Sequence, residues 1–103
     1  MYPSHEAFRL LNKWKSEKTT IRLLLTLSFG AGSFVGKVAA VEGTSVHLLS
    51  ADGSSDFWLS LIAASFEYRA ERDESESTAS AKYKRSLIAT FPSKAKIVFS
   101  QLQ

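Results

Sequence analysis

Few side chains in this sequence have the types and spacing that catalysis or metal binding requires. The 103 residues include two histidines and no cysteine, which excludes disulfides, thiolate-bound metals and a cysteine nucleophile. The carboxylates of Glu42, Asp52 and Asp56 lack the dense spacing of a calcium-binding loop. His47 and Asp52 precede several serines, but chain order alone does not indicate a catalytic triad. We therefore expect no cofactor, no metal and no enzymatic activity.

The glycines between residues 30 and 36 do not form a nucleotide-binding motif. Their pattern is G-x-G-x-x-x-G, which differs from the dinucleotide fingerprint. Extended residues follow where that fingerprint requires the beginning of a helix. We interpret residues 30 to 32 as a turn between two strands.

Basic residues near the C-terminus provide the main signal for a binding function. Residues 82 to 103 contain five basic and no acidic side chains, whereas residues 38 to 66 contain three acidic and no basic ones. Two aromatic residues are interleaved with the basic ones, so the segment could neutralise phosphates and stack bases, unless both rings face the core. His47 is a further candidate contact, with a structural role as the alternative. The basic candidates are Lys82, Lys84, Arg85, Lys94 and Lys96.

The N-terminal segment predicts a helix over residues 4 to 16. Ser4 is the expected N-cap, and Glu6 lies in the first turn, where the helix dipole favours a carboxylate. Apolar residues recur at helical spacing up to Trp14, which predicts an amphipathic helix packed on a sheet. Contact with a membrane surface or with nucleic acid is the alternative interpretation.

Residues 20 to 70 predict barrel strands in an antiparallel meander. Apolar residues alternate from residue 20, and the pairs at residues 42–43 and 52–53 resemble primed hairpin turns. The second turn leads into a single long strand over residues 56 to 68. No apolar stretch approaches the roughly 20 residues of a membrane-spanning helix. We expect no membrane partner and a cytoplasmic location.

The remaining C-terminal part predicts a loop and then further strands. Residues 71 to 82 have no apolar side chain larger than alanine, so we expect a mobile polar loop. Strands are expected over residues 83 to 102, with an interruption at Pro92. Residues 1 to 103 should form a single domain, because the chain is too short for two independent cores.

The predicted strand at residues 56 to 68 is apolar on both faces. An antiparallel sheet with one face in water should instead alternate apolar with polar residues. The core can cover one face, and the N-terminal helix can cover part of the other, so a second copy should cover the remainder. We therefore expect a homo-oligomer formed partly by edge-strand pairing. The expected interface residues are Trp14, Trp58, Ile62 and Phe66.

The order of a helix, bent strands, short turns and a closing strand resembles the Sm-like fold. The best local match is Phe34-Val35-Gly36, followed six residues later by Glu42 and then by Leu48 and Leu49. The resemblance implies a small, strongly bent antiparallel barrel that assembles into rings through its edge strands. Gly36 would permit the close backbone approach that such a bend needs.

The positions with which Sm-like proteins bind RNA carry other residue types here. Val46 and Thr44 stand where those proteins place an asparagine and a stacking ring. The second Sm motif is absent, and the polar residues 71 to 82 occupy its place. We therefore predict an all-β protein with an N-terminal helix that is a non-enzymatic self-assembling or protein-interaction module. The alternative is an RNA-binding Sm-like ring protein that uses the basic C-terminal residues.

Overall fold

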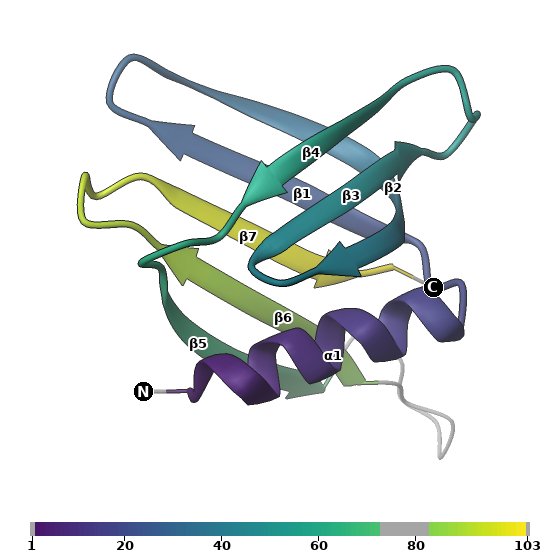
Figure 1. The fold of residues 1–103 in the computed structure, drawn as a ribbon, viewed down its shortest axis with the longest axis horizontal. Coiled ribbons are helices and arrows are strands. Elements are labelled where there is room, and N and C mark those ends of the chain that lie inside the picture. Colours follow the sequence, from purple (N-terminus) through teal and green to yellow (C-terminus); the bar gives the residue numbers. More distant parts are fainter. Residues whose placement is uncertain (1, 73–82, 103) are drawn as a thin grey trace.

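The computed structural model, which describes residues 2–72 and 83–102, contains an antiparallel sheet of seven strands and a helix packed against it (Figure 1). The helix α1 covers Ser4–Ser16, as predicted. The strands are β1 (Ile21–Leu27), β2 (Gly30–Glu42), β3 (Ser45–Ser50), β4 (Asp56–Ser60), β5 (Ser65–Arg72), β6 (Tyr83–Thr90) and β7 (Lys96–Gln101). The prediction of an antiparallel β protein with an N-terminal helix is confirmed.

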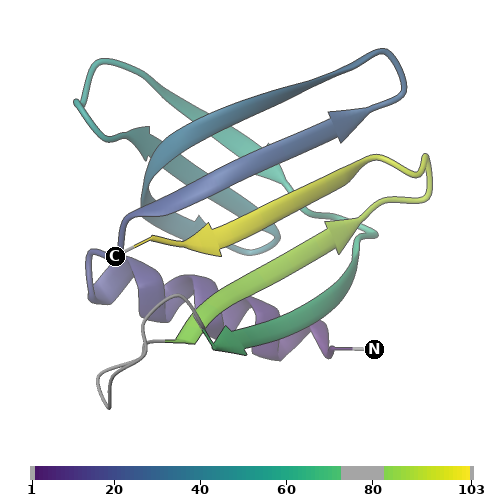
Figure 2. The same ribbon diagram turned by 180° about the vertical axis from the view of Figure 1, so that it is seen from behind.

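Two consecutive meanders share this sheet. Strands β1 to β4 form the first and β5 to β7 the second, and the pairing of β1 with β7 joins them (Figures 1 and 2). In this β1–β7 seam, Ile21 lies opposite Gln101, so the seam joins the first strand to the last. The strand order is β4-β3-β2-β1-β7-β6-β5, which leaves β4 and β5 as edges of a sheet that is not closed.

The core lies between the concave face of the sheet and α1. The helix buries Ala7, Leu10, Leu11 and Trp14, and it contacts β2 and β5 across the opening between the two meanders (Figure 1). Alternate strand residues complete the core, because successive side chains of a strand point to opposite faces. Each large apolar side chain contributes about 1.5 to 3 kcal/mol on burial. The fully buried strand residues with the largest side chains are Ile21, Leu23, Val46, Leu48, Leu87 and Phe99.

Gly36 lies where β2 pairs with both of its neighbouring strands. The first half of β2 pairs with β1 and the second half with β3, and Gly36 lies opposite both Ile21 and Ser50. A Cβ atom at this position would overlap the carbonyl oxygen of Leu49. The close backbone approach predicted for this glycine is therefore confirmed.

Two turns differ from their predictions. The first hairpin turns at residues 28–29, and residues 30–32 already pair with β1 as part of β2. The predicted strand at 56 to 68 is two strands, because residues 61–64 leave the sheet and Ala63 adopts a left-handed conformation with φ of 62°. The predicted glycine turns are present, with φ of 59° at Gly43 and 75° at Gly53.

The beginning of α1 and the beginning of the polar segment also differ from their predictions. Pro3, not Ser4, is the N-cap of α1, and no side-chain hydrogen bond caps this end of the helix. Residues 71 and 72, predicted to begin the loop, extend β5, and residues 73–82 of that prediction lie outside the described residues. Strands β6 and β7 fall within the range of 83 to 102 that was predicted for the C-terminal strands.

Candidate functional site

The four predicted interface residues do not share one surface. Trp14 and Phe66 are only 1% and 4% exposed and belong to the chain's own core, which leaves little of either side chain for a partner to contact. Trp14 lies on the buried face of α1. Phe66 is buried because the turn at residues 61–64 places it on β5, where its ring packs edge-to-face with that of Phe8. Trp58 stays on β4 and is 52% exposed, and Ile62 lies in the turn with 66% exposed. These two remain available to a partner.

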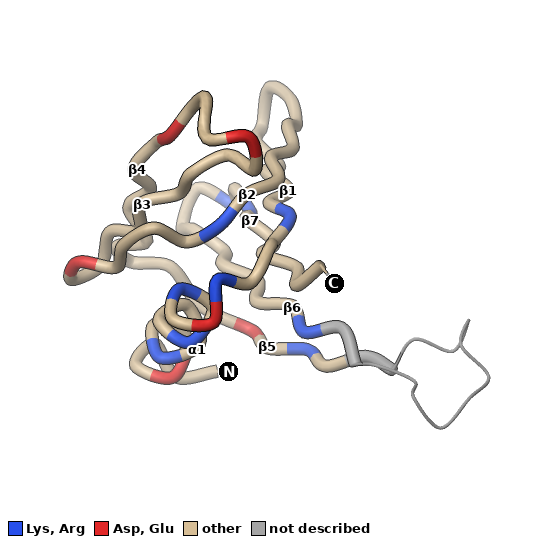
Figure 3. The backbone as a smooth tube through the Cα atoms, turned by 90° about the vertical axis from the view of Figure 1, so that its right-hand side faces the viewer, with Lys and Arg blue, Asp and Glu red and all other residues tan. Residues whose placement is uncertain are grey.

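The predicted nucleic-acid contacts are also distributed. Lys82 lies outside the described residues, and Lys84 and Arg85 occupy the beginning of β6. Lys94 lies in the turn after β6, and Lys96 pairs with the last residue of β6, at the opposite end of the strand. Figure 3 shows basic residues on α1 as well as on β5 and β6. Nucleic-acid binding by the predicted set stays a prediction.

Strands β3 and β4 bring three polar or aromatic side chains together at one edge of the sheet. The Nε2 atom of His47 lies 2.6 Å from Oδ2 of Asp56. The imidazole of His47 stacks on the indole of Trp58, with ring centroids 4.7 Å apart and an angle of 7° between the planes. His47 and Trp58 are direct partners in the register, and Asp56 lies two residues before Trp58. The three side chains therefore share the outer face of the sheet.

The hydrogen bonds at both ends of the β3–β4 pairing show which backbone groups of β4 are free. Leu61 donates its N–H to the carbonyl of Thr44 at 2.8 Å, and Ser50 donates to Ser55 at 2.8 Å. Hydrogen-bonded residue pairs alternate with non-bonded pairs along an antiparallel ladder. Phe57 and Leu59 therefore bond to β3.

The other three residues of β4 direct their amide and carbonyl groups away from β3. These residues are Asp56, Trp58 and Ser60. Because β4 ends the strand order, these groups point to an edge where no described strand pairs. The same alternation explains the stacked rings, since side chains of a non-bonded pair lie closer together than those of a bonded pair.

Asp52 orders the loop that leads into β4. Its Oδ1 atom accepts hydrogen bonds from the hydroxyl of Ser54 at 2.6 Å, the amide of Ser54 at 2.9 Å and the hydroxyl of Ser50 at 2.7 Å. These bonds, those of Ser54 first, lower the pKa of Asp52 to about 2. The charged carboxylate therefore holds the hairpin that sets the register of β4 against β3.

Sequence reasoning found part of this site and missed the rest. His47 and Trp58 were both candidates, for different functions, and their contact was not predicted. Asp56 was considered only as a metal ligand. A hairpin centred on residues 52–53 places residues 47 and 58 opposite one another, so counting outward from the turn is the signal that could have found the pair.

No family model, no curated protein and no solved structure matches this chain. Within residues 2–72 and 83–102, no three potential metal-ligating side chains gather in one place. The helix of this described region is also too short and too polar to cross a membrane. The cytoplasmic location stays a prediction.

Proposed function

We propose that this protein is a non-enzymatic interaction module that associates with a second copy of itself through β4. The supporting observation is the free edge of this strand together with the exposed indole of Trp58. An unpaired strand edge presents amide and carbonyl groups that another strand can bind. Assembly through edge strands is also what the Sm-like resemblance implies, and the assignment to that family is part of the proposal.

The sequence of β4 suits pairing with itself. The strand reads Asp-Phe-Trp-Leu-Ser, with an apolar residue on each side of the tryptophan and a polar residue at each end. In an antiparallel pair centred on Trp58, the two indoles oppose each other and Phe57 opposes the partner's Leu59. Asp56 then opposes the partner's Ser60, whose hydroxyl can donate to the carboxylate. No like charges meet in this register.

The backbone supports the same register. Antiparallel pairing about Trp58 requires outward amide and carbonyl groups at residues 56, 58 and 60, and the hydrogen-bond pattern against β3 leaves those groups outward. A shift that brings Asp56 opposite the partner's Asp56 is disfavoured by charge repulsion. On the outer face, the stack of His47 on Trp58 would continue into the stack of the second copy.

The predicted association is weak. One strand of five residues supplies a small interface, and small interfaces are typical of transient contacts. An aromatic cross-strand pair adds about 0.5 to 1.5 kcal/mol beyond the area that it buries. We expect a dimer with a dissociation constant on the order of 100 µM.

Sedimentation velocity from about 10 µM to 1 mM tests the proposal, since this range brackets the expected constant. The variant Trp58→Lys places two ammonium groups opposite each other on the symmetry axis and should leave the protein monomeric. The matched control is Ile62→Lys, which adds the same charge at another exposed apolar residue and should still dimerise. A monomeric wild-type protein at the highest concentration, or equal behaviour of the two variants, would reject pairing through β4.

A further inference from the structure

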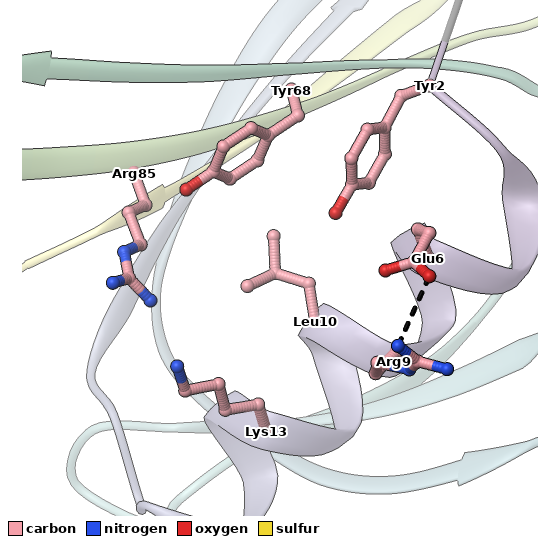
Figure 4. Close-up of a pocket in the computed structure, with 7 residues that line it drawn as sticks. All are labelled: Tyr2, Glu6, Arg9, Leu10, Lys13, Tyr68 and Arg85. Atoms are coloured by element: carbon pink, nitrogen blue, oxygen red, sulfur yellow. Dashed lines mark ion pairs between the residues drawn. The ribbon is translucent and has the colours of Figure 1, made fainter.

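A cavity of about 320 Å³ lies between α1 and strands β5 and β6, away from the β4 edge (Figure 4). One wall is aromatic, because Tyr2 and Tyr68 stack with ring centroids 5.2 Å apart and an angle of 22° between the planes. Leu10 projects from the helix into the middle of the lining. The wall and floor therefore offer an apolar surface to the body of a ligand.

Two cations from different elements converge at one end of this cavity. Figure 4 shows the ammonium of Lys13 and the guanidinium of Arg85 directed toward the same space beside Leu10. Lys13 also forms a half-exposed ion pair with Glu17 of its own helical segment, at 3.9 Å, and such exposed pairs contribute little. Within the described part of the chain, Arg85 makes no ion pair. Two like charges directed at one space repel each other, and an anion between them removes that repulsion.

The other end of the cavity has a different character. Glu6 pairs with Arg9 at 3.2 Å, which balances the charges at this end. Burial, and then the nearby Glu6 carboxylate, raise the pKa of Tyr2 above its ordinary value of 10.0. A phenol is protonated at neutral pH, so the Tyr2 hydroxyl can donate a hydrogen bond. The Glu6 carboxylate can accept a hydrogen bond from a ligand and would repel a second anionic group. The cavity thus has a cationic end, an apolar middle and a hydrogen-bonding end.

We infer that this cavity binds a small organic phosphate, in which a planar ring carries a phosphate monoester. A phosphate monoester has a charge of about −1.5 to −2 at neutral pH, which Lys13 and Arg85 together balance. The planar guanidinium of Arg85 can donate two hydrogen bonds to phosphate oxygens. The ring would lie against the tyrosines, with a donor group on its far side facing Glu6. This inference does not depend on self-association through β4.

The volume limits the size of the ligand. Ligand cavities range from about 300 to 1,000 Å³, so this one is at the small end of the range. A nucleoside monophosphate is a ligand of suitable size and has both the ring and the phosphate. Adenosine 5′-monophosphate is therefore the probe for the experiment, and its amino group supplies the donor that the Glu6 end requires.

Titration calorimetry with adenosine 5′-monophosphate tests the inference. We expect saturable binding at one site. Adenosine lacks the phosphate and inorganic phosphate lacks the ring, so each should bind at least roughly tenfold more weakly than the monophosphate. Arg85→Gln should weaken binding of the monophosphate by about tenfold, which is the usual effect of losing a charge-assisted hydrogen bond. Tyr68→Leu should weaken the binding of the monophosphate and leave the binding of inorganic phosphate unchanged.

The matched control is Lys96→Gln, which removes an exposed cation at the opposite end of β6 and β7. It should bind the monophosphate like the wild-type protein. An equal loss in Lys96→Gln and Arg85→Gln would reveal general electrostatic attraction and overturn the inference. Equal affinity for adenosine and its monophosphate would also overturn it, as would binding of a single-stranded oligonucleotide without binding of the mononucleotide. Circular dichroism checks that every variant retains its sheet.

Discussion

The chain covers one edge of its sheet and leaves the other edge open. At β5, the amide of Tyr2 donates to the carbonyl of Phe66 at 3.0 Å, and α1 contacts the strand. At β4, no described strand pairs with the outer edge, and Trp58 stands exposed beside it. The carbonyl of Phe66 on β5 is thus paired within the molecule, whereas the outward groups of β4 have no partner strand among the described residues. This difference is why we propose β4, and not β5, as the edge for self-association.

Substitution of Gly36 should have the largest effect, because a side chain there would disrupt the close approach of β2 and β3. In Gly36→Ala, the new Cβ would overlap the carbonyl oxygen of Leu49, a backbone atom of the β2–β3 pairing. We expect the free energy of unfolding to fall by about 3 kcal/mol, the upper end of the usual cost of overpacking. Urea denaturation measures this loss.

Gly32 provides the matched control, since it also lies in β2 and a Cβ at that position meets no atom within 4 Å. Gly32→Ala should change the free energy of unfolding by less than about 1 kcal/mol. Equal losses of unfolding free energy in the two variants would mean that the close approach at Gly36 does not require the absence of a side chain.

Removal of the Tyr2 ring should have a smaller effect, confined to the covered edge. Tyr2→Ala loses the stack on Tyr68 and should lower the free energy of unfolding by about 1 kcal/mol. Tyr2→Phe keeps a ring for stacking and should retain most of the stability in thermal unfolding. Dimerisation through β4 should be unaffected by either variant. If Tyr2→Phe were as destabilised as Tyr2→Ala, the stack would not be what stabilises this edge.

Protonation of Asp52 should have the smallest effect, and that effect should be confined to the loop before the open edge. The pKa of Asp52 is lowered to about 2 from its ordinary value of 3.8. A carboxyl whose pKa is depressed by folding stabilises the folded state above its unfolded pKa, and this contribution disappears as the pH falls through the folded value. The loop before β4 should therefore loosen as the pH falls from about 4 to 2.

The amide proton shift of Ser54 follows this titration in NMR spectra, because that amide donates to Asp52 at 2.9 Å. In Asp52→Asn the shift should stay constant over the same pH range. A titration midpoint of the Ser54 amide shift near the ordinary pKa of aspartate would show that the hydrogen bonds to Asp52 do not persist in solution.

Periodicity and glycine turns predicted most of the secondary structure, and one undetected turn caused the main error. The turn at residues 61–64 contains neither glycine nor proline, and Ala63 adopts a left-handed conformation that alanine rarely takes. Without that signal, Trp58 and Phe66 were assigned to one face of one strand. They lie on different strands, one exposed and one buried.

The two candidate sites differ in how far the sequence could reveal them. The pairing of His47 with Trp58 is local, because one hairpin sets its register. The cavity beside α1 combines residues that are far apart in the chain, namely Tyr2, Lys13, Tyr68 and Arg85. Their proximity depends on how the second meander lies against the helix, and local patterns do not determine that arrangement.

The β1–β7 seam also determines the order in which the molecule can assemble. Each meander pairs strands that are neighbours in the chain, whereas the seam joins Ile21 to Gln101. Contacts between distant residues form slowly, because a long stretch of chain must be ordered first. A nascent polypeptide would therefore display β1 as a temporary edge until β7 leaves the ribosome. Pulsed hydrogen exchange during refolding should accordingly protect the amides that pair β2 with β3 before those that pair β1 with β7.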